Sequence, residues 1–200
     1  MKKPLKQQTL IVIVLIAIIT SVSVAGAYFV LPKNTNPNPH IILPTMNLTV
    51  TGANGDEIVL NSSDIALLEA YTAAGGYKRA NSNIQGVGKY TGIPILTICN
   101  LVGGITSNNT IRATATDNYQ ATYTYKQVNG QELNTYDPIT GNATQVTNPL
   151  TMIVAYHLNG TSLSASDGPL SIAIVGPQSL LTDGKLWTRL LVKIEILTST

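Results

Sequence analysis

The segment from Thr151 to Ile196 constrains the fold most, because it contains three strand-like stretches separated by turn sequences. Residues 152–157 and 170–175 are almost entirely apolar, and residues 190–197 alternate with a period of two. Turns are expected at Asn159-Gly160 and at Asp167-Gly168-Pro169, which contain the residue types that favour turns. A chain that ends in this way is expected to build its core around a β-sheet.

The residues before this segment add a hairpin and two short helices. Residues 47–60 alternate around Asn54-Gly55, a sequence typical of a tight hairpin turn. Ser62-Ser63-Asp64 is expected to begin a helix that continues to about Ala70. A second helix is expected over residues 95–101, ended by the glycine pair that follows.

The remaining stretches are read as short strands and loops. Strands are expected over 77–80, 110–116 and 119–127, a glycine-rich loop over 81–92, and a polar stretch with several turns over 129–148. Many short strands with few short helices predict an α+β domain that is mainly β, with mixed sheets.

The N-terminus has the pattern of a membrane segment. Three lysines and no acidic residue precede Leu10–Leu31, which is uncharged and mostly apolar. About 20 such residues span a bilayer as a helix, and the lysines place their own end in the cytoplasm. We expect residues 1–31 to anchor the chain by a single pass in the cell membrane, with the rest outside. The alternative is a secreted protein, because small residues precede Ala27 and favour signal cleavage there.

A spacer follows the membrane segment. Residues 32–45 contain four prolines and three asparagines, which favour an extended, semi-rigid conformation. Residues 46–200 are then the extracytoplasmic domain, long enough to bury one core.

Charge and cysteine usage exclude several classes of function. Only 11% of the residues are charged, and without Lys2, Lys3 and Lys6 nine basic residues face ten acidic ones, a net charge of −1. Nucleic-acid binding is not expected, since it needs clustered basic residues. The single cysteine, Cys99, excludes an intrachain disulfide and a CxxC motif.

Several motifs of the domain follow one another in a recognisable order. They are Tyr90-Thr91-Gly92-Ile93-Pro94-Ile95, Ala115-Thr116-Asp117-Asn118-Tyr119, Asn159-Gly160, Gly168-Pro169-Leu170 and Gly184-Lys185-Leu186-Trp187. Between about Leu48 and Ile196, this order resembles the molybdopterin-binding domain of the sulfite oxidase family. The resemblance implies a sulfite-oxidase-like fold, with a cleft between residues 75–92 and 117–119.

The chain departs from this family at the metal ligand. The family holds molybdenum through a cysteine in the loop after the first helix, where a soft thiolate suits the metal. Residues 75–83 contain no cysteine, and Cys99 is expected to be a packed, inert thiol in the following helix. We therefore expect neither metal ligand nor catalytic residue, and no cofactor, with molybdopterin as the alternative. For a pterin or another small ligand in the cleft, the resemblance implies contacts from Lys78, Arg79, Asn81, Lys89, Arg112, Asp117 and Tyr119.

Other motifs are given structural interpretations. Gly86-Val87-Gly88-Lys89 lacks the spacing of a phosphate loop. His157 has no visible partner for acid–base chemistry, and Asp117 and Asp137 are turn residues. Trp187 and the tyrosines are expected at the edge of the core, with a ligand cleft as the second interpretation.

Five asparagines lie in N-x-[ST] sequences that could accept a glycan. They are Asn47, Asn61, Asn108, Asn142 and Asn159, and all fall at predicted turns or strand ends. With the anchor and the low charge, they favour a cell-surface glycoprotein, of a kind common in archaea.

Three functions remain open at this point. The first is a membrane-tethered binding or surface module without molybdenum catalysis. The second is a molybdopterin-dependent oxidoreductase that lacks the protein thiolate. The third is a structural subunit of a surface filament or layer, which would self-associate through exposed strand edges.

Overall fold

The computed structural model describes residues 43–198. The expected membrane segment, with the alternative of signal cleavage after Ala27, lies outside the described residues, as does most of the spacer. Among residues 43–198, no helix has the length and apolar character needed to cross a membrane.

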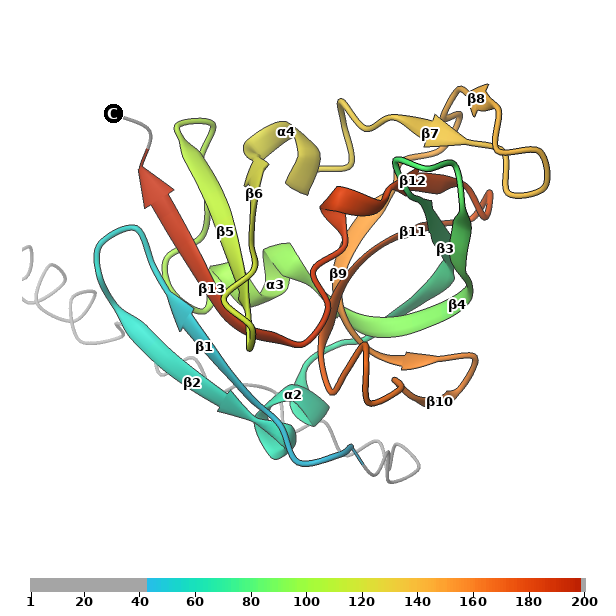
Figure 1. Cartoon of the computed structure of the whole chain (residues 1–200). Coiled ribbons are helices and arrows are strands. Elements are labelled where there is room, and N and C mark those ends of the chain that lie inside the picture. Colours follow the sequence, from blue (N-terminus) through green and yellow to red (C-terminus); the bar gives the residue numbers. More distant parts are fainter. Residues whose placement is uncertain (1–42, 199–200) are drawn as a thin grey trace, which may run out of the picture. The chain divides into compact units, whose positions relative to one another are not determined.

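A five-stranded sheet contains the first and the last strand of the described chain (Figure 1). The predicted hairpin is confirmed, with Gly55 at φ +90° in its turn. The first strand of that hairpin pairs in parallel with the last strand of the domain, so the sheet is mixed. In spatial order the strands are β2 (Glu57–Asn61), β1 (Asn47–Thr51), β13 (Leu191–Thr198), β5 (Asn109–Ala115) and β6 (Gln120–Thr124).

The second sheet closes on itself. Strand β3 pairs with β4 and β11, and β9 pairs with the same two strands, so these four form a closed circuit. Strands β12, β7 and β8 extend from β3, and β10 extends from β9. The eight strands are β3 (Tyr71–Lys78), β4 (Ile84–Pro94), β7 (Thr135–Tyr136), β8 (Ala143–Thr144), β9 (Thr151–Leu158), β10 (Thr161–Ser162), β11 (Ser171–Gly176) and β12 (Leu181–Asp183).

Strand β4 replaces the glycine-rich loop expected over 81–92, so that prediction is wrong. Its glycines let the strand pack closely against other chain segments. A Cβ on Gly92 would lie 2.2 Å from the Val154 carbonyl oxygen and 2.5 Å from the Ala155 Cα. Glycine is needed here because two backbones approach each other, which composition alone does not distinguish from a flexible loop.

Four short helical elements complete the domain: α2 (Ser62–Leu67), α3 (Ile95–Asn100), α4 (Tyr125–Val128) and the 3₁₀ turn η1 (Gly184–Leu186). Helix α2 begins as predicted, but Asn61 is its cap. The Asn61 Oδ1 accepts from the amides of Ser63 and Asp64, while the Asp64 carboxylate accepts from the Asn61 amide. The same reciprocal capping by Thr124 and Gln127 starts α4, and the strand expected over 119–127 therefore ends at Thr124.

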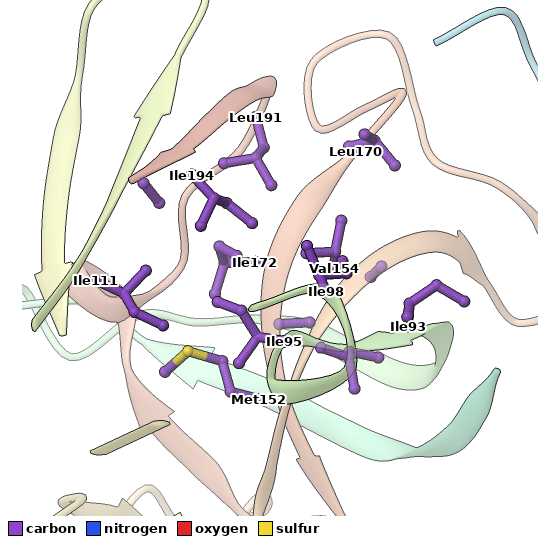
Figure 2. Packing of buried hydrophobic residues seen from close by; sticks show 14 of the residues in the cluster. Ile93, Ile95, Ile98, Ile111, Met152, Val154, Leu170, Ile172, Leu191 and Ile194 are labelled. Atoms are coloured by element: carbon purple, nitrogen blue, oxygen red, sulfur yellow. The ribbon is translucent and has the colours of Figure 1, made fainter. Parts of the chain in front are cut away.

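The core lies between the sheets and around α3. Figure 2 shows Ile111 and Ile194 of the five-stranded sheet converging with Met152 and Ile172 of the second sheet. Ile95 of α3 lies beside them and is fully buried, and all six residues of β11 are buried. The prediction of a mainly β, α+β domain with mixed sheets and few short helices is consistent with this architecture.

Candidate functional site

Three adjoining pockets lie where four loop segments meet at one side of the domain. The segments are the β3–β4 turn, the β5–β6 turn, the loop before β11, and the connection from β12 through η1 to β13. The central pocket, of about 380 Å³, is lined by Tyr77, Arg79, Ala115, Asp117, Tyr119, Ser166, Gly184, Trp187, Arg189 and Leu190.

The other two pockets share walls with the central one. The lateral pocket, of about 700 Å³, shares Arg79 and Gly184 with it and is otherwise lined by Lys78, Ala80, Asn81, Ser82, Tyr136, Asp183 and Lys185. The aromatic pocket, of about 370 Å³, shares Tyr77, Ser166, Trp187 and Arg189, and adds Gln85, Gly86, Tyr90, Leu158, Leu163, Asp167 and Ser171.

The chain's single tryptophan forms the wall between the central and aromatic pockets. The Trp187 indole donates to Thr182 Oγ1 at 2.8 Å, which fixes the ring from behind. Its ring centroid lies 5.2 Å from those of Tyr77 and Tyr90, within the range of favourable aromatic contacts. The Tyr90 hydroxyl donates to the Gly86 carbonyl at 2.7 Å, and burial raises the pKa of Tyr90, so this wall stays uncharged.

Two arginines give the central pocket its positive charge. Arg79 is exposed, and among the described residues its guanidinium has neither an ion pair nor a hydrogen bond. Arg189 contacts Asp167 at 3.4 Å, a long contact between side chains that are both more than a third exposed. Such a pair is weak, so the Arg189 guanidinium retains donors for a ligand.

Two of the four charged residues that line the lateral pocket, Lys78 and Asp183, already have partners. The Lys78 Nζ donates to the Gly141 carbonyl at 2.8 Å and lies 4.6 Å from the centre of the Tyr136 ring. The Asp183 carboxylate accepts from the Tyr136 hydroxyl at 2.7 Å and from the Asn134 amide at 2.9 Å. Arg79 is the cation that lines both the lateral and the central pocket, and Lys185 is a second exposed cation of the lateral pocket.

The predicted site residues fall into two groups. Lys78, Arg79 and Asn81 line the lateral pocket, and Arg79, Asp117 and Tyr119 line the central one. The Tyr119 hydroxyl donates to the Lys185 carbonyl at 3.1 Å, which connects the β5–β6 turn to η1.

The other two predicted residues lie outside these pockets. Lys89 has an exposed side chain on β4, and its backbone amide donates to Asn159 Oδ1 at 2.9 Å. Arg112 lies on β5 and is bound to Glu195 of β13 at 2.9 Å. Lys89 and Arg112 are close to the family motifs in the sequence but do not line the pockets, so closeness in sequence does not identify the basic residues of the site.

Sequence reasoning missed the contribution of Arg189 and Asp167 to the site. The Leu190 amide donates to the Asp167 carbonyl at 3.0 Å, which brings the loop before β11 beside the segment that follows η1. The available signal was the Gly184-Lys185-Leu186-Trp187 motif, which marks the segment that Arg189 follows.

The cysteine of this chain does not fit a metal site. The Cys99 thiol is fully buried in α3, and burial raises its pKa to about 12. No cysteine occurs in the hairpin from Tyr71 to Pro94. Within residues 43–198, no three histidine, cysteine or acidic side chains are grouped to hold a metal ion. The residues present therefore do not fit a molybdenum centre held by a protein thiolate.

Other residues that the sequence analysis considered for a function can now be placed in the structure. Burial lowers the pKa of His157, whose ring packs edge-on against Tyr156 at 4.8 Å. Asp117 accepts from the Tyr119 amide, and Asp137 accepts from the Ile139 and Thr140 amides, so both are turn residues as predicted. All five asparagines of the glycosylation sequences are exposed.

Comparison with known proteins supports a related fold and goes no further. No protein-family model matches the sequence, and no curated protein matches it. Among solved structures, the sulfane dehydrogenase SoxCD from Paracoccus pantotrophus is similar, with a TM-score of 0.53 and 13% sequence identity. The similarity covers 76% of this chain but only 38% of that chain. It supports the resemblance to the sulfite oxidase family at the level of a related fold.

Proposed function

We propose that residues 46–200 form an extracytoplasmic module that binds a small organic anion without molybdenum catalysis. The observation that carries this proposal is the presence of Arg79 and Arg189 at one pocket of about 380 Å³. The hairpin that supplies Arg79 contains no cysteine, so the fold keeps a cleft while lacking the thiolate.

The chemistry of the central pocket favours an anionic ligand. A guanidinium is planar, always charged at neutral pH, and donates two parallel hydrogen bonds to a carboxylate. The pocket's carboxylate, Asp117, already accepts from the backbone of its own turn. Among the described lining residues we find no nucleophile paired with a base, so binding is better supported than catalysis.

Thermal unfolding of the full-length protein in the presence of anions tests this proposal. A ligand that binds the folded state raises the melting temperature. We expect acetate or a sugar acid to raise it relative to chloride at the same ionic strength, and this rise to be lost in Arg79→Gln. Lys89→Gln is the matched control, because Lys89 is an exposed cation outside the pockets. An equal rise in wild type and Arg79→Gln would refute the site.

A molybdopterin-dependent oxidoreductase without a protein thiolate is the second candidate. The lateral pocket favours it, because it is the largest of the three adjoining pockets and is lined by Lys78, Arg79 and Asn81, three of the predicted pterin contacts. The fold likeness to a dehydrogenase is consistent with it. The metal content of the native protein separates the two candidates.

The setting of the module is also proposed from the sequence. We infer a cell-surface glycoprotein of archaeal type, held by residues 1–31 in the membrane. The exposure of Asn47, Asn61, Asn108, Asn142 and Asn159 supports modification at two or more of them. An intact mass of the native protein equal to that of the bare sequence would contradict this inference.

A further inference from the structure

The aromatic pocket adds a second recognition element beside the proposed anion site. It adjoins the central pocket and shares Tyr77, Trp187 and Arg189 with it. Because Arg189 lines both pockets, a ligand bound to this arginine can contact both. A volume of about 370 Å³ lies near the lower end of the range for small-molecule sites, which suits a single ring.

The lining of this pocket combines ring faces with polar groups. Tyr77, Tyr90 and Trp187 supply aromatic surface, against which the C–H face of a saturated ring can pack. Gln85 and Asp167 line the same pocket. The Asp167 carboxylate accepts from the Ser164 hydroxyl at 2.6 Å and lies 3.4 Å from Arg189, and each of its oxygens keeps a further lone pair for a ligand hydroxyl. The Gln85 Oε1 accepts from the Tyr77 hydroxyl at 3.3 Å, while the amide nitrogen of Gln85 has no partner among the described residues.

These polar groups distinguish between classes of ring. An apolar ring would cover the Asp167 carboxylate and the Gln85 amide without offering hydrogen bonds, which carries a desolvation cost. A ring that carries hydroxyl groups would donate to Asp167 and accept from Gln85. The pocket therefore favours a polyhydroxylated ring.

Resting on the proposed anion site, we infer that the ligand is a sugar acid. Its carboxylate lies in the central pocket between Arg79 and Arg189, and its ring lies in the aromatic pocket beside Trp187. This assignment names both parts of the ligand, whereas the proposed function requires only the anionic group.

Trp187 provides a direct reporter, because it is the only tryptophan in the chain. Calorimetry gives the affinity, and Trp187 fluorescence reports occupancy beside the indole. Both are measured on full-length protein in an uncharged detergent without a sugar headgroup. The probes are D-glucuronate, glucose, acetate, sulfate and benzoate, so that acid and ring are tested separately and together.

We expect D-glucuronate to bind at least about tenfold more tightly than the other four probes and to change Trp187 fluorescence saturably. Loss of a charged hydrogen bond in Arg79→Gln should weaken D-glucuronate binding by about tenfold or more, while Lys89→Gln leaves it unchanged. Because Arg79 is exposed, its replacement should not disturb folding, which circular dichroism verifies.

The other outcomes separate this inference from the proposed function. Equal or tighter binding of acetate, sulfate or benzoate, still dependent on Arg79, would overturn the sugar acid and leave the anion site standing. Binding of D-glucuronate with no change at Trp187 would overturn the placement of the ring. If calorimetry shows no binding of any anion, both this inference and the proposed anion site are wrong.

Discussion

A buried side chain that does not line the pockets supports the candidate site. Tyr123 on β6 is fully buried, and its hydroxyl donates to the Leu186 carbonyl and lies 2.8 Å from Thr188 Oγ1. These contacts fix residues 186–188, the segment that contains Trp187 and directly precedes Arg189. Burial raises the pKa of Tyr123, so the hydroxyl stays protonated and remains a donor.

Replacing Tyr123 with phenylalanine tests this support. The Leu186 carbonyl would lose its buried donor, which we expect to lower the free energy of unfolding by about 1–3 kcal/mol. Tyr125→Phe is the control, because the Tyr125 hydroxyl has no hydrogen-bond partner in the described part of the chain. Urea unfolding measures both variants, and equal stability of the two would contradict the role of Tyr123.

The ion pair between Arg112 and Glu195 makes the stability of the fold depend on pH in a way that can be measured. The hydrogen bond from Arg112 is the main cause that lowers the pKa of Glu195 below its ordinary value of 4.5. A carboxyl group with a lowered folded-state pKa stabilises the fold above pH 4.5, and this contribution is lost as the pH falls through the folded-state pKa.

Glu195→Gln should therefore be less stable than wild type near pH 7, and the difference should shrink as the pH falls from about 5 toward 3. Glu69→Gln is the control, since Glu69 is exposed and has no ion pair among residues 43–198. Urea unfolding across this pH range measures the difference. A difference that is constant with pH would contradict the ion pair as its source.

At the scale of elements, the sequence predicted strands better than it predicted contacts between them. The hairpin, α3, β5, β9, β11 and β13 could be placed from alternation and turn residues. Strands β3 and β4 could not. The strand expected over 77–80 is wrong, because β3 runs from Tyr71 to Lys78, and the glycines of β4 are typical of loops as well as of close packing. The pockets could be predicted only in part, since Arg189 and Asp167 reach them through long-range pairing that no local pattern encodes.

Gly92→Ala tests the explanation for β4. Its Cβ would overlap the backbone of β9, and we expect a loss of about 2–3 kcal/mol of stability or more. Gly103→Ala is the comparison, because Gly103 has φ +96° but no atom lies within 4 Å of the place that its Cβ would take. Backbone strain alone should cost about 1–2 kcal/mol there. If chemical denaturation shows Gly92→Ala to be the milder change, close packing of β4 is not the reason for its glycine.

At the scale of the whole molecule, the described domain ends in several strand edges. Strands β2 and β6 form the edges of the first sheet, and β10 and β8 lie at the ends of the second. Self-association through such edges is the third hypothesis. Asn61 lies on β2 opposite Asn47 of β1, and a glycan on either asparagine would hinder pairing at the β2 edge. Size-exclusion chromatography of the native protein distinguishes an assembling chain from a monomeric module.

The central claim is that this fold keeps a ligand cleft while lacking thiolate-held molybdenum. Elemental analysis by mass spectrometry of protein purified from its own host tests it most directly. We expect molybdenum and tungsten far below one atom per chain. In the same sample, we expect an anion to raise the melting temperature, and this rise to depend on Arg79. Stoichiometric molybdenum or tungsten would contradict the account and favour the oxidoreductase.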